Sequence, residues 1–151
     1  MTQVLKYVPL ERDQLTETKP RVDVFRNQEY LAEPSPYDVP VGITAGYDVK
    51  SKRLSLALEY VADEPTVINS FKEKVALHVG KNSGRIYQVD LEGVDLDQAI
   101  SQKSIALIDD VIDRVATERK NAIPQRYAIA KQAINVAGDL ILKDPDGLKA
   151  L

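Results

Sequence analysis

The sequence predicts an α+β fold: a roughly four-stranded antiparallel sheet of two hairpins, packed on one face by a C-terminal two-helix hairpin, with an extended N-terminal arm. Two changes of pattern carry this prediction. Apolar and polar residues alternate between residues 41 and 95, which is typical of strands with one buried face. Between residues 96 and 143 the apolar residues recur with a period of about 3.6, which is typical of amphipathic helices.

Length and composition limit the possibilities further. A chain of 151 residues fits one domain, in which residues 1–40 form the arm, 41–95 the sheet, 96–143 the helices and 144–151 a tail. The absence of cysteine excludes disulfides, cysteine zinc sites and thiol nucleophiles. A net charge of −3 does not favour broad nucleic-acid binding. No signal peptide or membrane span is recognisable, so we expect a cytoplasmic protein with no membrane contact.

The arm contains five of the eight prolines and little regular pattern. Within it, residues 21–26 resemble a strand and residues 4–8 a second, weaker one. The arm either lies over its own domain or crosses onto a second subunit. In the second case its apolar residues would need a groove on the partner; these are Tyr30, Leu31, Tyr37 and Val39.

Four strands are expected between residues 41 and 95. The residues assigned to the buried face are Val41, Ile43, Ala45, Tyr47, Leu54, Leu56, Leu58, Tyr60, Val75, Leu77, Val79, Tyr87, Val89 and Leu91. The outer face then holds small or apolar residues, namely Gly42, Thr44, Ala57, Ala76 and Ile86. Polar turns are expected at residues 48–52 and 80–84. The longer link over residues 63–70 is expected to cross one end of the sheet.

Capping and breaking residues delimit the two helices. Asp95 and Gln98 form a capping box for the first helix, and the segment from Asn121 to Pro124 ends it and begins the second. The second helix has two adjoining apolar strips, one with Tyr127 and Ile134 and the other with Ile129. This apolar face is wider than contact with one sheet requires, which favours self-association.

Three short motifs suggest chemistry, and each has an ordinary structural alternative. Asp109 and Asp113 lie one helical turn apart and could share Mg²⁺, although Asp110 and Arg114 are spaced as a surface ion pair. The segment 144–147 begins like a calcium loop, but the twelfth loop position would fall beyond Leu151, so we interpret it as a helix stop. The glycine-bounded segment 80–84 has the residue types of a phosphate cradle, but a strand follows it, which favours a hairpin turn.

His78 is the only histidine, and the alternation places it on the outer face. It lacks a recognisable nucleophile or metal partner, so the sequence assigns no catalytic, cofactor-binding or metal residues and no cofactor. The tyrosines Tyr47, Tyr60 and Tyr87 are expected in the core.

We therefore expect a small non-enzymatic interaction module that assembles as a homo-oligomer, most simply a dimer. The alternative is a small-molecule-binding or enzymatic domain with a pocket between sheet and helices, near His78, Arg53 and Glu59. Nucleic-acid contact is a weaker third possibility, through a basic patch of Arg114, Arg119, Lys120, Arg126 and Lys131 interspersed with acidic residues.

Overall fold

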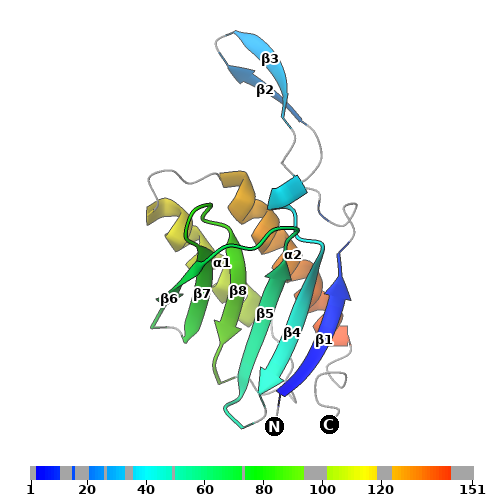
Figure 1. Cartoon of the computed structure of the whole chain (residues 1–151), viewed down its shortest axis with the longest axis vertical. Helices are drawn as coiled ribbons and strands as arrows, with labels where there is room; N and C mark the ends of the chain where they lie inside the picture. The colour runs from blue at the N-terminus through cyan, green and yellow to red at the C-terminus, as the bar shows by residue number, and fades with distance from the viewer. Residues whose placement is uncertain are drawn as a thin grey trace.

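The computed structural model covers the whole chain and describes residues 3–10, 15, 21–25, 27–32, 36–48, 50–72, 74–93, 102–118 and 124–143 (Figure 1). The strands are β1 (Gln3–Pro9), β2 (Arg21–Phe25), β3 (Gln28–Ala32), β4 (Gly42–Asp48), β5 (Arg53–Glu59), β6 (Thr66–Ser70), β7 (Val75–Gly80) and β8 (Ile86–Leu91). A short 3-10 turn, η3, spans Pro36–Asp38, and the helices are α1 (Gln102–Glu118) and α2 (Pro124–Lys143).

The predicted α+β class is confirmed, but the sheet is larger than expected. It has six antiparallel strands in the order β1-β4-β5-β8-β7-β6, rather than four. One additional strand, β1, is the weaker strand expected at residues 4–8 of the arm, and it pairs along the outside of β4. The other, β6, lies in the segment that we expected to be a plain crossing at the end of the sheet. After β5 the chain passes to the far edge and returns through β6, β7 and β8, so that β8 pairs with β5 (Figure 1).

Both helices cover the same face of this sheet, as predicted (Figure 1). The core between the layers consists of the alternate residues of the strands and one stripe of each helix. Its fully buried members include Ile43, Leu54, Leu77, Ile108, Ile112, Ile129 and Ile134. A buried aliphatic side chain of this size contributes roughly 1.5–3 kcal/mol relative to exposure, so this layer is the main source of stability.

Val41 and Ile86 depart from the predicted alternation. Val41, which we expected on the buried face, precedes β4 and is 49% exposed. Ile86, which we expected on the outer face, is buried because of a β-bulge. His78 pairs with Gln88, whereas Val79 pairs with Ile86, so Tyr87 is an extra residue in β8. Because of this extra residue, the residues of β8 that precede it face the opposite side of the sheet from the one that the alternation predicted. Ile86 therefore lies in the core. Tyr87 packs edge-on against Tyr60 with ring centroids 5.0 Å apart.

The arm has two parts with different surroundings. Leu15 is fully buried in the core of its own chain. In contrast, β2 and β3 form a separate hairpin that stands away from the sheet and helices (Figure 1). The strand expected at residues 21–26 is therefore found as β2, and its partner β3 was not expected.

The expected turns are also found. Asp48 accepts hydrogen bonds from the backbone N–H groups of Lys50 and Ser51, which closes the β4–β5 turn. Gly84, with φ of 78°, lies in the β7–β8 turn, where its N–H donates to the carbonyl of Gly80. Pro124 opens α2, as expected of a proline in a first turn. The capping box at Asp95 and the stop at residues 144–147 lie outside the described residues.

Candidate functional site

The outer face of the sheet holds a polar cluster centred on Asp90. Asp90 Oδ2 lies 2.8 Å from Nε2 of His78, and its Oδ1 accepts a hydrogen bond of 2.8 Å from Nε2 of Gln88. Ser55, which is paired with Asp90 across β5 and β8, also bonds to the carboxylate. Three neighbouring strands thus direct polar side chains to one carboxylate.

The cluster perturbs the ionisation of Asp90. Burial alone would raise the pKa of this carboxyl group, but the hydrogen bonds from Gln88, Ser55 and His78 outweigh burial and hold the pKa below its ordinary value. The side chains of His78 and Asp90 are only 20% and 13% exposed. Asp90 is therefore an ionised, well-hydrogen-bonded acceptor at neutral pH.

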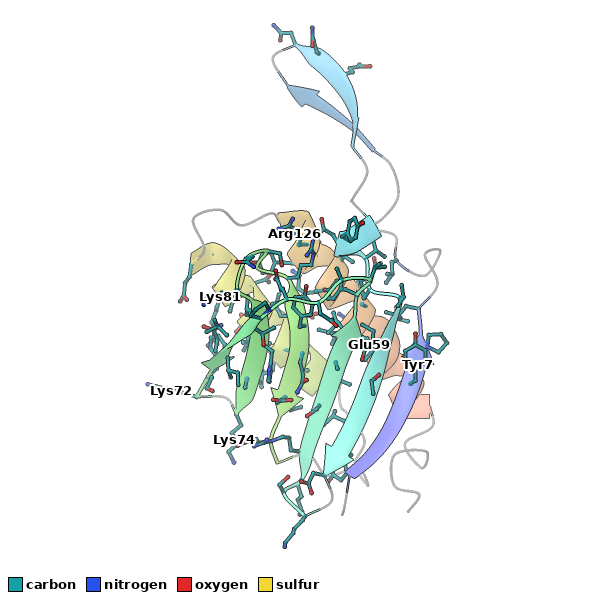
Figure 2. All side chains as sticks on the ribbon, in the orientation of Figure 1. Tyr7, Glu59, Lys72, Lys74, Lys81 and Arg126 are labelled. Carbon is teal, nitrogen blue, oxygen red and sulfur yellow. The ribbon has the colours of Figure 1, made fainter. Side chains whose placement is uncertain are left out.

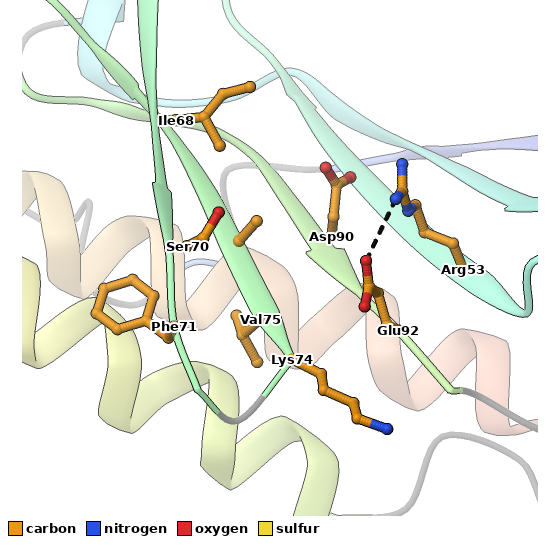
Figure 3. A pocket seen from close by; sticks show the side chains of 9 residues that line it. Arg53, Ile68, Ser70, Phe71, Lys74, Val75, Asp90 and Glu92 are labelled. Carbon is orange, nitrogen blue, oxygen red and sulfur yellow. Dashed lines mark hydrogen bonds and ion pairs between the residues drawn. The ribbon is translucent and has the colours of Figure 1, made fainter.

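Two adjoining cavities lie over this cluster. One, of about 370 Å³, is lined by Asp48, Arg53, Ser55, Ile68, His78, Gln88 and Asp90. The other, of about 260 Å³, extends towards the β6–β7 turn and is shown in Figure 3. Arg53, Ile68 and Asp90 line both cavities, and Arg53 forms a 3.3 Å ion pair with Glu92 at their shared border.

The three residues proposed from the sequence for a pocket are only partly brought together. His78 and Arg53 line the same cavity, but Glu59 accepts a hydrogen bond of 3.1 Å from Thr44 on β4 and lines neither cavity. All three are on the outer face, whereas the space between sheet and helices holds the apolar core. The contribution of Asp90 was missed, although its spacing of two from Gln88 indicated a shared face.

The contact with the Asp90 carboxylate orients the imidazole ring of His78. A carboxylate that holds one ring nitrogen fixes the ring and its tautomer, which prepares the other nitrogen to accept a proton or a ligand. Among the described residues, however, no group of three or more histidine, aspartate or glutamate side chains could hold a metal ion. The cluster can therefore orient His78 towards a bound molecule, but it does not provide a metal site within the described part of the chain.

A second charged cluster lies at the end of the sheet nearest the β2–β3 hairpin. Asp38 of η3 accepts hydrogen bonds on one oxygen from Nε of Arg85 at 2.7 Å and Nε of Arg126 at 2.9 Å. Arg126, labelled in Figure 2, also donates to the carbonyl of Ser83. Burial by itself would lower the pKa of Arg85, but the bonds to Asp38 and Tyr87 raise it overall. The cluster joins η3, the β7–β8 turn and α2, so we assign it a structural role.

The glycine-bounded turn at residues 80–84 is occupied by the chain itself. The Glu64 carboxylate accepts hydrogen bonds from the backbone N–H and the hydroxyl of Ser83. It also lies so close to Gly80 that a Cβ at that position would overlap it. The predicted hairpin turn is thus found, and its anion-accepting groups bind an internal carboxylate.

The aspartate-rich segment of α1 joins the two helices. Asp109 accepts hydrogen bonds from Asn135 of α2, and Asp113 forms a 2.7 Å ion pair with Lys131 of α2. Asp110 pairs with Arg114 at 2.8 Å, which is the surface pair that the sequence suggested. Burial raises the pKa of Asp109 despite its bonds to Asn135. Each carboxylate therefore has a protein partner.

The described residues of the proposed basic patch also have acidic partners. Arg114, Arg126 and Lys131 each contact an aspartate, and Arg119 and Lys120 lie outside the described residues. These pairs lower the local positive charge that phosphate contact would require.

The edge strand β6 is mostly exposed. Its five residues, Thr66 to Ser70, carry no charge, and four of them are exposed. Val67 is 50% exposed and Ile68 is 59% exposed. Opposite Ile68 on β7 lies His78, so this edge borders the Asp90 cluster.

Neither described helix combines the length and the apolar character that crossing a bilayer requires. No family model, curated protein or solved structure matches this chain.

Proposed function

We propose that this chain is a cytoplasmic, non-enzymatic interaction module that associates with itself, most simply as a dimer. The observation that carries the proposal is the outer edge of β6, along which no strand of the described residues pairs. Its backbone polar groups and its two exposed aliphatic side chains form a surface to which another strand can add.

Natural sheets usually protect such edges with charged side chains, prolines, bulges or a covering segment. The opposite edge strand, β1, contains Lys6 and Pro9. By contrast, β6 contains neither a charged residue nor a proline, and its register with β7 is uninterrupted. A second chain that covers this edge would remove a surface that otherwise promotes uncontrolled pairing.

Contacts within one chain account for two features that had favoured self-association, namely the wide apolar face of α2 and the N-terminal arm. The wide apolar face of α2 packs against both the sheet and α1, because Ile129, Ala133 and Ile134 are all fully buried. Leu15 of the arm is buried in the same core. The support for association therefore comes from the β-structure rather than from the helices.

Light scattering over a concentration series tests the proposal. We expect a monomer–dimer equilibrium in the range of tens of micromolar, because an interface made by one short strand is small. A strict monomer throughout this range would contradict the proposed function. A matched variant would replace residues 22–31 by a two-residue Asn-Gly turn between Arg21 and Ala32, which are paired across the β2–β3 hairpin. It should dimerise as the parent chain does, because β6 is intact.

The outer-face cavities favour a second candidate function, the binding of a small polar molecule beside His78. An oriented imidazole, Arg53 and the aliphatic wall of Ile68 together resemble the mixed lining of ligand sites. Thermal-shift screening of the parent chain against metabolites, with His78→Ala as the matched control, tests it. A ligand that raises Tm in the parent chain but not in the variant supports this function, and no shift with any ligand contradicts it.

A further inference from the structure

We infer that β6 pairs antiparallel with β6 of a second copy of this chain, about a two-fold axis at Ile68, so that the two sheets become continuous. This inference rests on the proposed self-association and specifies its surface, its partner and its register. It depends on which backbone groups of β6 are free, on where its flanking charges lie and on which side chains meet at the axis.

The hydrogen bonds at the two ends of β6 show which residues face its free edge. The N–H of Phe71 donates to the carbonyl of Val75 at 2.8 Å, and the N–H of Lys81 donates to the carbonyl of Pro65 at 2.8 Å. Hydrogen-bonded and non-hydrogen-bonded positions alternate along an antiparallel pair. Positions 65, 67, 69 and 71 therefore face β7, and the N–H and C=O groups of Thr66, Ile68 and Ser70 face outwards.

These three outward-facing residues select the register. A two-fold axis at Ile68 forms three pairs between the copies. Ile68 pairs with Ile68 of the second copy, Thr66 pairs with Ser70 of the second copy, and Ser70 pairs with Thr66 of the second copy. Each such pair exchanges two hydrogen bonds, so the three pairs provide about six. An axis at residue 67 or 69 would pair only two of the three residues within β6. The register centred on Ile68 satisfies the most edge groups.

The charges that flank β6 are complementary in this antiparallel arrangement. Asp63 and Glu64 precede the strand. Lys81 lies at the same end, because its backbone N–H donates to the carbonyl of Pro65, and it brings the net charge of these three residues to −1. The segment 72–74, Lys-Glu-Lys, follows the strand with a net charge of +1. Figure 2 shows Lys72 and Lys81 near opposite ends of β6. The two-fold axis places each acidic end beside the basic end of the other copy.

The side chains at the axis agree with this pairing. Ile68 would contact Ile68 of the second copy on the outer face, where each is already beside His78 of its own chain. Val67 would lie opposite Asn69 of the second copy on the other face. No like charges oppose each other within the strand, because β6 is uncharged. A second copy of β6 is thus a suitable occupant of this edge.

Single-cysteine cross-linking tests the register, because the parent chain has no cysteine. In Ile68→Cys the two Cα atoms would be about 5.5 Å apart, which a disulfide can span. In Val67→Cys the two Cα atoms would be about 8 Å apart, which is too far. We expect Ile68→Cys to cross-link under mild oxidation and Val67→Cys alone not to do so. A mixture of Val67→Cys with Asn69→Cys should form the mixed dimer, and exposed Thr117→Cys on α1 measures random collisions.

A charge at the axis provides an independent test. Ile68→Lys places two ammonium groups opposite each other and should weaken dimerisation at least tenfold, whereas Val67→Lys lies opposite Asn69 and should change it less than threefold. Unchanged circular dichroism would show that both variants fold.

The outcomes separate the two proposals. If the parent chain is monomeric, the proposed function and this inference both fail. If the parent chain dimerises but Ile68→Cys cross-links no faster than Thr117→Cys and Ile68→Lys still dimerises, the edge pairing is wrong and self-association uses another surface. Cross-linking of Val67→Cys with itself in place of Ile68→Cys would overturn the register.

Discussion

Replacing Asp38 by alanine should destabilise the protein strongly, because one of its carboxylate oxygens accepts hydrogen bonds from two arginines. Asp38 is 9% exposed, and it accepts hydrogen bonds from Arg85 and Arg126 at 2.7 and 2.9 Å. The arginine side chains are themselves only 15% and 20% exposed. The variant would leave two guanidinium groups partly desolvated and without their counter-charge.

The size of the loss follows from these contacts. Removing one member of a buried ion pair typically costs 3–5 kcal/mol, and we expect about 3 kcal/mol because water still reaches both arginines. In urea, with an m-value of about 2 kcal/mol per molar, the unfolding midpoint should fall by about 1.5 M. Asp38→Asn keeps the shape and one acceptor but not the charge, so it should cost about half as much.

Equilibrium urea unfolding followed by circular dichroism measures these differences. Asp110→Ala is the matched control, because its pair with Arg114 is largely exposed and should contribute only about 0–0.5 kcal/mol. If Asp38→Ala and Asp110→Ala lower the free energy of unfolding by the same small amount, the Asp38 cluster does not hold η3, the β7–β8 turn and α2 together. The structural role assigned to it would then be wrong.

Three further predictions concern the sheet. A Cβ at Gly42 would overlap the ring of Tyr7, so Gly42→Ala should cost about 1–2 kcal/mol in unfolding experiments, and almost nothing in a Tyr7→Ala background. A Cβ at Gly80 would displace the Glu64 carboxylate, so Gly80→Ala should lower Tm by several degrees, but should lower it much less when Glu64 is already alanine. The pKa of Asp90 is lowered in the folded state, so the ionised carboxylate stabilises the fold above the unfolded-state pKa of about 3.9, and this contribution is lost as pH falls through the folded-state pKa. Asp90→Asn should therefore be less stable than the parent chain at pH 7, with a difference that disappears in acid, and a difference that does not change with pH would contradict this reasoning.

Local pattern was sufficient for much of the fold. The alternation through β4, β5 and β7 and the helical period of α1 and α2 predicted the class and the shared core, because each of these elements contributes one apolar face to that core. The outer-face position of His78 followed from the same alternation. The turns at residues 48–52 and 80–84 were recognisable because their polar and glycine residues favour tight turns.

Pairing between distant segments was not predictable in this way. The strand β6 is exposed along most of its length, so its residues show no alternation from which to recognise it. The bulge at Tyr87 reversed the face of Ile86, and an extra residue in a strand leaves no trace in composition. The convergence of Ser55, His78 and Gln88 on Asp90 depends on the order β5-β8-β7.

The sequence by itself determined which faces of β4, β5, β7 and the two helices are apolar, because that property belongs to each of these segments alone. Only the tertiary structure decided which strands are neighbours and which strand is left at the edge, because backbone hydrogen bonds between strands form with little regard to side-chain identity. The free edge of β6, on which the proposed self-association depends, is therefore a property of the assembled sheet.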